Sequence, residues 1–243
     1  MFPYDPNILA AVQTTPQTIA DVVQILEAIQ SVSDDGDGLK WFNGLYLQVT
    51  QAVEARVNAG EFEDPAWIAA LDVRFARFYF AAIQASFSGG AQGQTPGCWQ
   101  ALFDQRSQVS LARIQFALAG MNAHINHDLP QAVLDLCQTT AVAPQHGTVP
   151  YNDFTALNGT LDSLINKARI TLHVRLLGDA LPPVSHLEDT LAAWSLADAR
   201  EAAWNNAELL WHLRDAPLAA SALLTTVDGL TAIVSKTLLV PAP

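Results

Sequence analysis

The chain has 243 residues, of which 50% are hydrophobic and 15% are charged, and its formal net charge is −12. This composition excludes an intrinsically disordered chain. The acidic surplus excludes nucleic acid and anionic membrane surfaces as natural partners, because both are polyanions that bind basic patches. Alanine and leucine dominate, and alternating runs rich in Val, Ile and Thr are scarce, so the sequence predicts an all-α fold.

The cysteines and the search for targeting segments indicate a cytoplasmic protein. Cys98 and Cys137 form no C-x-x-C pair, and we expect both to pack as small hydrophobic side chains in a reduced compartment. The N-terminus lacks a basic segment followed by an apolar one, as a secretory signal would require. The best candidate for a membrane span, residues 111–121, is too short and carries Arg113, so we expect no membrane span.

Turn residues and apolar periodicity divide the chain into helices. Thr15-Pro16 is expected to open the first helix and Asp64-Pro65 the third, because proline is tolerated in the first turn of a helix. The expected helices cover about 16–32, 39–58, 65–87, 98–106, 109–127, 129–143, 152–177, 187–215 and 217–239. We therefore expect a single-domain bundle of eight or nine helices over residues 1–243, with an N-terminal arm at 1–14 and a tail at 240–243.

The polar run at residues 122–128, NAHINHD, closes an otherwise apolar helix. Arg113, His124 and Asp128 follow helical spacing and are expected to lie along one stripe. A histidine and a carboxylate one turn apart can ligate a transition metal or supply an acid and a base to a substrate. The partner motifs H-E-x-x-H and paired E-x-x-H are both missing, so no metal is assigned here.

A purely structural interpretation of this run stays open. Asn126 or Asp128 can cap the helix that begins at Leu129-Pro130, since a side-chain acceptor satisfies free backbone N–H groups there. His124 is then a core histidine with a hydrogen bond across the bundle. Asn122 forms an i, i+4 pair with Asn126, and His127 is expected to be incidental.

Asp72 is a further candidate because it lies between Leu71 and Val73 on an aromatic helix. An acid in such surroundings needs a partner, and the candidates are Arg113, Arg77 and His124.

The helix predicted over residues 187–215 carries a band rich in Trp and Arg. Arg200 and Trp204, one turn apart, suit cation–π packing or the binding of an anionic group. In the preceding helix, Asn158, Asp162 and Asn166 recur every four residues, as is typical of a solvated face or of a polar network.

Four segments resemble a bacterial family of helical proteins known as domain of unknown function 5995. They are WFNxLYLxVT at 41–50, LDVxFA at 71–76, QFALAGMNAHINHDLP at 115–130 and ARxxAWxxA at 199–207. The resemblance implies a common fold and singles out His124, Asn126 and Asp128 as part of the family pattern, while the slot of His127 is variable. It gives no indication of an activity, and the cofactors stay unknown. Polar residues in such a pattern indicate binding more often than packing.

The leading functional hypothesis is a protein, with or without catalytic activity, that binds a small molecule in a polar pocket between helices. His124, Asp128 and Asp72 are its candidate catalytic residues. The candidate substrate-binding residues are Asn122, Asn126, Arg113, Arg200 and Trp204.

One alternative is a non-catalytic binding or scaffolding protein in which the polar run is a hydrogen-bond and capping network. A second is a metal-dependent hydrolase or oxidase. A homodimer through Trp41, Phe42 and Trp67 is a further expectation.

Overall fold

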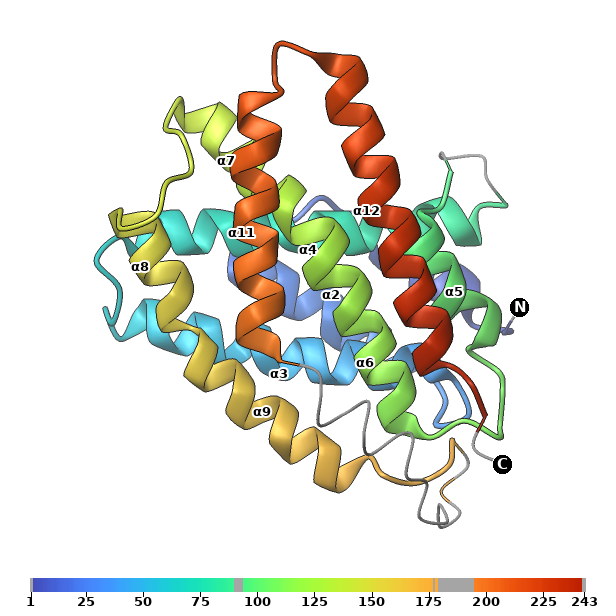
Figure 1. The fold of residues 1–243 in the computed structure, drawn as a ribbon. Coiled ribbons are helices and arrows are strands. Elements are labelled where there is room, and N and C mark those ends of the chain that lie inside the picture. Colours follow the sequence, from blue (N-terminus) through green and yellow to red (C-terminus); the bar gives the residue numbers. More distant parts are fainter. Residues whose placement is uncertain (1, 90–93, 177, 179–194, 242–243) are drawn as a thin grey trace.

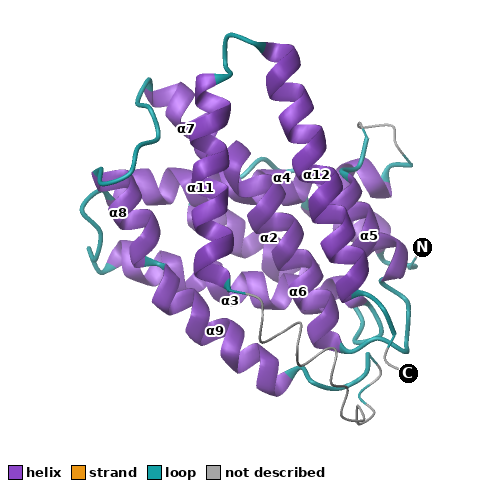
Figure 2. Ribbon diagram, viewed as in Figure 1, coloured by secondary structure: helices purple, strands orange, loops and turns teal. Residues whose placement is uncertain are grey.

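The computed structural model describes residues 2–89, 94–176, 178 and 195–241, and it confirms the all-α fold. No β-strand occurs within these ranges, as Figure 2 shows. The helices are α1 (Asp5–Ala11), α2 (Ile19–Val32), α3 (Gly38–Asn58), α4 (Pro65–Phe87), α5 (Gly97–Gln105), α6 (Arg113–Ala123), the π-helical turn η1 (His124–Asp128), α7 (Leu129–Thr140), α8 (Val149–Ala156), α9 (Asn158–Thr171), α11 (Leu196–His212) and α12 (Pro217–Leu238).

The helix starts follow the capping residues closely. Thr18, Asp37 and Asp64 each accept a hydrogen bond from a backbone N–H two or three residues further on. The first predicted helix thus begins at Ile19, after the Thr18 cap, rather than at Pro16. The predicted helix 152–177 is divided into α8 and α9, and the first part of the helix predicted over 187–215 lies outside the described residues.

The segment expected as an N-terminal arm contains α1 and packs against the body. Ile8 is fully buried in the core. Arg106 Nη1 lies 2.9 Å from Asp5 Oδ1, and Arg106 Nε donates to Asp37 Oδ1 over 2.8 Å. This buried ion-pair cluster joins α1, the start of α3 and the end of α5, and removing one charge of such a cluster is costly.

The helix α6 runs through the centre of the bundle and is seen between α11 and α12 in the view of Figure 1. Every residue from Ile114 to Ala123 is buried, as expected for a helix enclosed on all sides. Gly120 permits a close approach to α3, because a Cβ at this position would collide with the Phe42 ring.

The chain continues from α6 into α7 through η1, where the sequence predicted a break. The Leu129 N–H donates to the carbonyl of His124, five residues back, as in a π-helix. Pro130 has no N–H to offer an α-helical partner, and a widened turn is a known way to accommodate this loss. Neither Asn126 nor Asp128 caps the following helix, since no side-chain cap is formed at its start.

Several polar contacts attach the C-terminal half of the helix α12 to the body. Asp228 accepts the N–H groups at the start of α5. Asn122 Nδ2 donates to Thr231 O over 3.0 Å and to Ser235 Oγ over 2.9 Å. Gln115 donates to two carbonyls at and after the end of α12. Figure 1 shows the other half of α12 extending past the ends of neighbouring helices together with α11.

The expectation that no segment of the chain is long and apolar enough to span a membrane is wrong. The helix Pro217–Leu238 is long and apolar enough to cross a membrane, and only 17% of its most apolar stretch is buried. A search for uncharged runs missed it because Asp228 and Lys236 interrupt the apolar residues. Leu218, Leu230 and Ile233 are among its exposed apolar side chains.

Replacing Gly120 with alanine should destabilise the protein by about 1–3 kcal/mol or more, because the added methyl group overpacks the contact between α6 and Phe42. Gly229→Ala is the matched control, since a Cβ on this glycine of α12 meets nothing within 4 Å. That control should be neutral or stabilising by up to about 1 kcal/mol. Urea unfolding followed by circular dichroism measures both, and equal effects would contradict the close approach.

Candidate functional site

A cavity of about 50 Å³ lies between α3, α4, α6, η1 and the helices α9 and α11 that cover them. Its walls are mainly Val, Leu, Ile, Phe and Met side chains. Four polar side chains join this lining: Tyr46, Asp72, His124 and Arg200. The volume accommodates a few water-sized groups, and an apolar pocket with a few convergent polar groups is the usual form of a small-molecule site.

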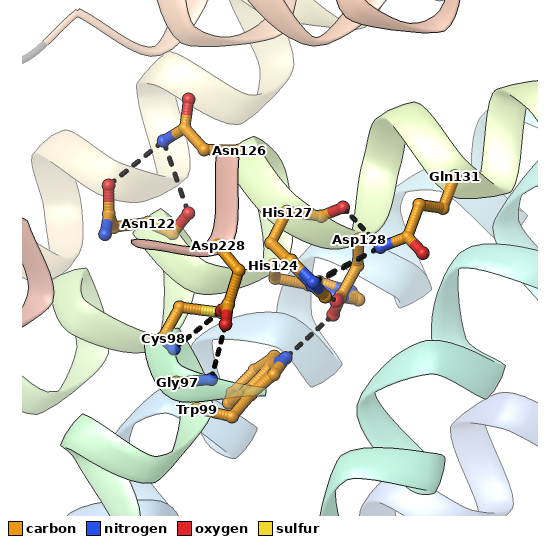
Figure 3. Close-up of polar contacts among 10 residues, drawn as sticks. All are labelled: Gly97, Cys98, Trp99, Asn122, His124, Asn126, His127, Asp128, Gln131 and Asp228. Carbon is orange, nitrogen blue, oxygen red and sulfur yellow. Dashed lines mark hydrogen bonds and ion pairs between the residues drawn. The ribbon is translucent and has the colours of Figure 1, made fainter. Parts of the chain in front are cut away.

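His124 is held in the cavity wall by two kinds of contact. Its Nδ1 lies 2.9 Å from Asp128 Oδ2 (Figure 3), and its ring stacks on Phe75 with 3.4 Å between the ring centroids. Since a carboxylate can only accept, Nδ1 carries the proton and Nε2 keeps its lone pair. Nε2 is buried and has no hydrogen-bond partner among the described residues.

Asp128 is buried and accepts from three side chains. In addition to His124, the indole N–H of Trp99 donates to Oδ2 over 3.0 Å, and His127 Nδ1 lies 2.7 Å from Oδ1. Burial raises the pKa of Asp128, but hydrogen bonds from the two histidines outweigh it, so the pKa lies below the usual value. Asp128 is therefore an anion that fixes both imidazole rings (Figure 3).

The two histidines differ in their pKa although they share this carboxylate. Burial is the larger influence at His124 and lowers its pKa, so that its ring is neutral at pH 7. At His127 burial also lowers the pKa, but the hydrogen bond and the charge of Asp128 prevail and raise it. One anion thus serves a neutral imidazole that lines the cavity and a more basic one outside it.

Asp72 contributes a second titratable group to the same cavity. Burial, and to a smaller extent the charge of Glu54, raises its pKa to about 7. Its Oδ2 has no hydrogen-bond partner among the described residues. Of the partners expected from the sequence, only His124 lines the same cavity, and Arg77 donates instead to the carbonyl of Pro16.

Arg200 reaches the cavity wall from α11. Its Nε donates to Asn158 Oδ1 and its Nη2 to Phe154 O, each over 2.7 Å. Burial lowers its pKa to about 9. The Arg200 guanidinium lies 4.0 Å from the Phe154 ring centroid. The Trp204 ring centroid lies 5.0 Å from that of Phe154, and Trp204 does not line the cavity.

The other three predicted site residues lie elsewhere. Arg113 is at the start of α6, eleven residues and thus about 16 Å from His124 along the helix axis, and its guanidinium lies 3.9 Å from the Trp41 ring centroid. Asn126 donates to the carbonyl and side chain of Asn122, which itself holds α12. Helical spacing placed these residues on related faces but could not assign them to one cavity.

Three residues of the site were not predicted from the sequence. Tyr46 and Phe75 line the cavity, and Trp99 supports Asp128 from α5. Tyr46 and Phe75 occur inside the family-like segments, and this was the signal in the sequence that could have identified them. Trp99 lies in a short helix with no motif, so nothing in the sequence connected it to Asp128.

These features define an all-α protein with a mostly apolar cavity between its helices and a buried Asp–His pair at the cavity wall. The model of the Family of unknown function (DUF5995) matches residues 19–241, and the chain belongs to this family. No curated protein and no solved structure matches it.

Replacing Asp72 with asparagine should change the pH dependence of stability. The folded pKa of about 7 lies above the unfolded value of about 3.9. The folded state therefore binds more protons between these pH values, and the wild type loses stability as pH rises from 4 to 7. The free energy of unfolding of the variant, relative to that of the wild type, should therefore rise by about 2–4 kcal/mol between pH 4.5 and pH 8.

Urea unfolding of both proteins at these two pH values measures the difference. Asp64→Asn, at a helix cap, is the control and should show no such gain. A pH-independent difference between Asp72→Asn and the wild type would show that Asp72 is ionised in the folded protein.

Proposed function

We propose that the protein binds a small, largely apolar carbonyl compound in the cavity and transfers a proton on it. The observation that carries this proposal is the buried His124 Nε2, which has no partner among the described residues and belongs to a ring fixed through Nδ1 by Asp128. A neutral imidazole with a free lone pair is a general base, and its orientation by a carboxylate is a recurring catalytic arrangement.

Asp72 supplies the complementary acid. Its pKa of about 7 keeps about half of the carboxyl groups protonated at neutral pH. Burial lowers the pKa of His124 and raises that of Asp72, so both groups are favoured in their neutral forms, one able to accept a proton and the other able to donate one. In the proposed step His124 removes a proton from the carbon next to the carbonyl, and Asp72 donates its proton to the carbonyl oxygen, which gives the enol.

The cavity walls support the choice of substrate. The apolar lining favours a hydrocarbon body, and the few polar groups limit the ligand to one or two hydrogen-bonding atoms. Arg200 adds positive charge at the wall, which favours an oxygen that gains negative charge. The alternative of a hydrogen-bond network without catalysis accounts best for Asn122 and Asn126, whose bonds serve the attachment of α12 and the local turn.

Methionine methyl groups provide a direct test of binding, because Met1 and Met121 are the two methionines of the chain and Met121 lines the cavity. With ¹³C-methyl methionine, addition of acetone or butanone should shift the Met121 signal in a saturable way and leave the Met1 signal in place. Met121→Leu assigns the two signals.

Proton transfer is measured in the same samples in D₂O, as deuterium enters the positions next to the carbonyl. His124→Gln should slow this exchange by about 100-fold or more, whereas His146→Gln, which does not alter a residue of the cavity lining, should leave it unchanged. Saturable binding without exchange would reject the catalytic role and favour a binding protein. The absence of any Met121 shift would reject the ligand itself.

A further inference from the structure

A second cluster of reactive side chains lies on the other side of Asp128. Cys98 of α5, His127 of η1 and Asp228 of α12 each place a potential ligand atom within 4.8 Å of the other two. Figure 3 shows Cys98 and Asp228 side by side, with His127 on the π-helical turn η1 next to them. From this juxtaposition we propose that the protein binds a divalent transition metal ion such as Zn²⁺ through Cys98 Sγ, His127 Nε2 and a carboxylate oxygen of Asp228.

The contacts around the cluster orient its members as a metal site requires. His127 Nδ1 lies 2.7 Å from Asp128 Oδ1, which leaves Nε2 as the ligand and makes Asp128 the supporting carboxylate. The N–H groups of Gly97 and Cys98 donate to the two oxygens of Asp228 over 2.8 and 2.9 Å, and each oxygen retains a further lone pair. These bonds hold the Asp228 carboxylate beside the Cys98 side chain.

The chemistry of the three ligands selects the cation. A thiolate with an imidazole favours Zn²⁺ and similar ions over Mg²⁺ or Ca²⁺, which prefer oxygen ligands alone. In a tetrahedral zinc site the ligand atoms are about 3.5 Å apart, so the distances within the cluster have to shorten by about 1.3 Å at most. The Cys98 thiol loses its proton to solvent as the metal–sulfur bond forms, and a water molecule completes the fourth position on the side where Asp228 is only half-buried.

The site is distinct from the cavity. His127, Cys98 and Asp228 do not line that cavity, and the proposed metal site does not depend on the cavity's ligand. In the sequence, Cys98 and Asp228 are 130 residues apart with no ligand motif at either, and Cys98 was expected to be a small hydrophobic side chain. The metal would join α5, η1 and α12, and it would therefore also strengthen the attachment of α12.

Cobalt binding tests the proposal without any assay of activity. The untagged full chain is treated with EDTA and titrated with Co²⁺, which gives a thiolate-to-cobalt absorption band only when a cysteine is a ligand. We expect this band to saturate at one equivalent. Zn²⁺ should abolish it, and competition with a chromophoric chelator then gives the Zn²⁺ affinity.

Cys98→Ser and Cys98→Ala should lose the band, and Asp228→Asn and His127→Gln should weaken Zn²⁺ binding by about 10-fold or more. Cys137→Ser is the matched control, because it removes the other buried free cysteine and should bind like the wild type. Circular dichroism identifies any variant that fails to fold. A wild type without the band, or a band that survives in Cys98→Ser, would overturn the proposal and leave a structural hydrogen-bond cluster.

Discussion

The buried carboxylate of Asp128 is the constraint on which the centre of this protein depends. It has one negative charge and two oxygens, and it accepts from Trp99, His124 and His127. A buried charge without such partners would be very costly, so these three side chains have to converge on it. Their convergence fixes the orientation of both imidazole rings and ties α5 to η1. The cavity wall and the cysteine-containing cluster are therefore two sides of one polar centre.

The π-helical turn makes this convergence compatible with a continuous helix. Regular α-helical geometry, with 3.6 residues per turn, places residues 124 and 128 on one face. It rotates residue 127 about 60° around the helix axis from residue 124. The wider turn brings His124 and His127 to the same carboxylate. Single π turns occur frequently at functional sites, and here the turn coincides with the most distinctive string of the family-like sequence.

Local signals predicted the helices well, and long-range contacts explain the rest. Asp64 and its following proline begin α4 as expected, because capping depends on neighbouring residues alone. The sequence indicates Asp72 as a candidate site residue because an acid between apolar residues of a helix is easily recognised. Arg113 was grouped with His124 because spacing gives a face of a helix but no position along a cavity. Cys98 could not be connected with Asp228, since only the docking of α12 on α5 brings them together.

The attachment of α12 has a consequence for folding during synthesis. Gln115 and Asn122 are buried in the central helix, yet the acceptors of their side-chain N–H groups lie 109 to 125 residues later in the chain. Until the ribosome has passed residue 240, these two side chains lack the acceptors that compensate for their burial. The core around α6 therefore cannot reach its final packing while the chain is only partly synthesised.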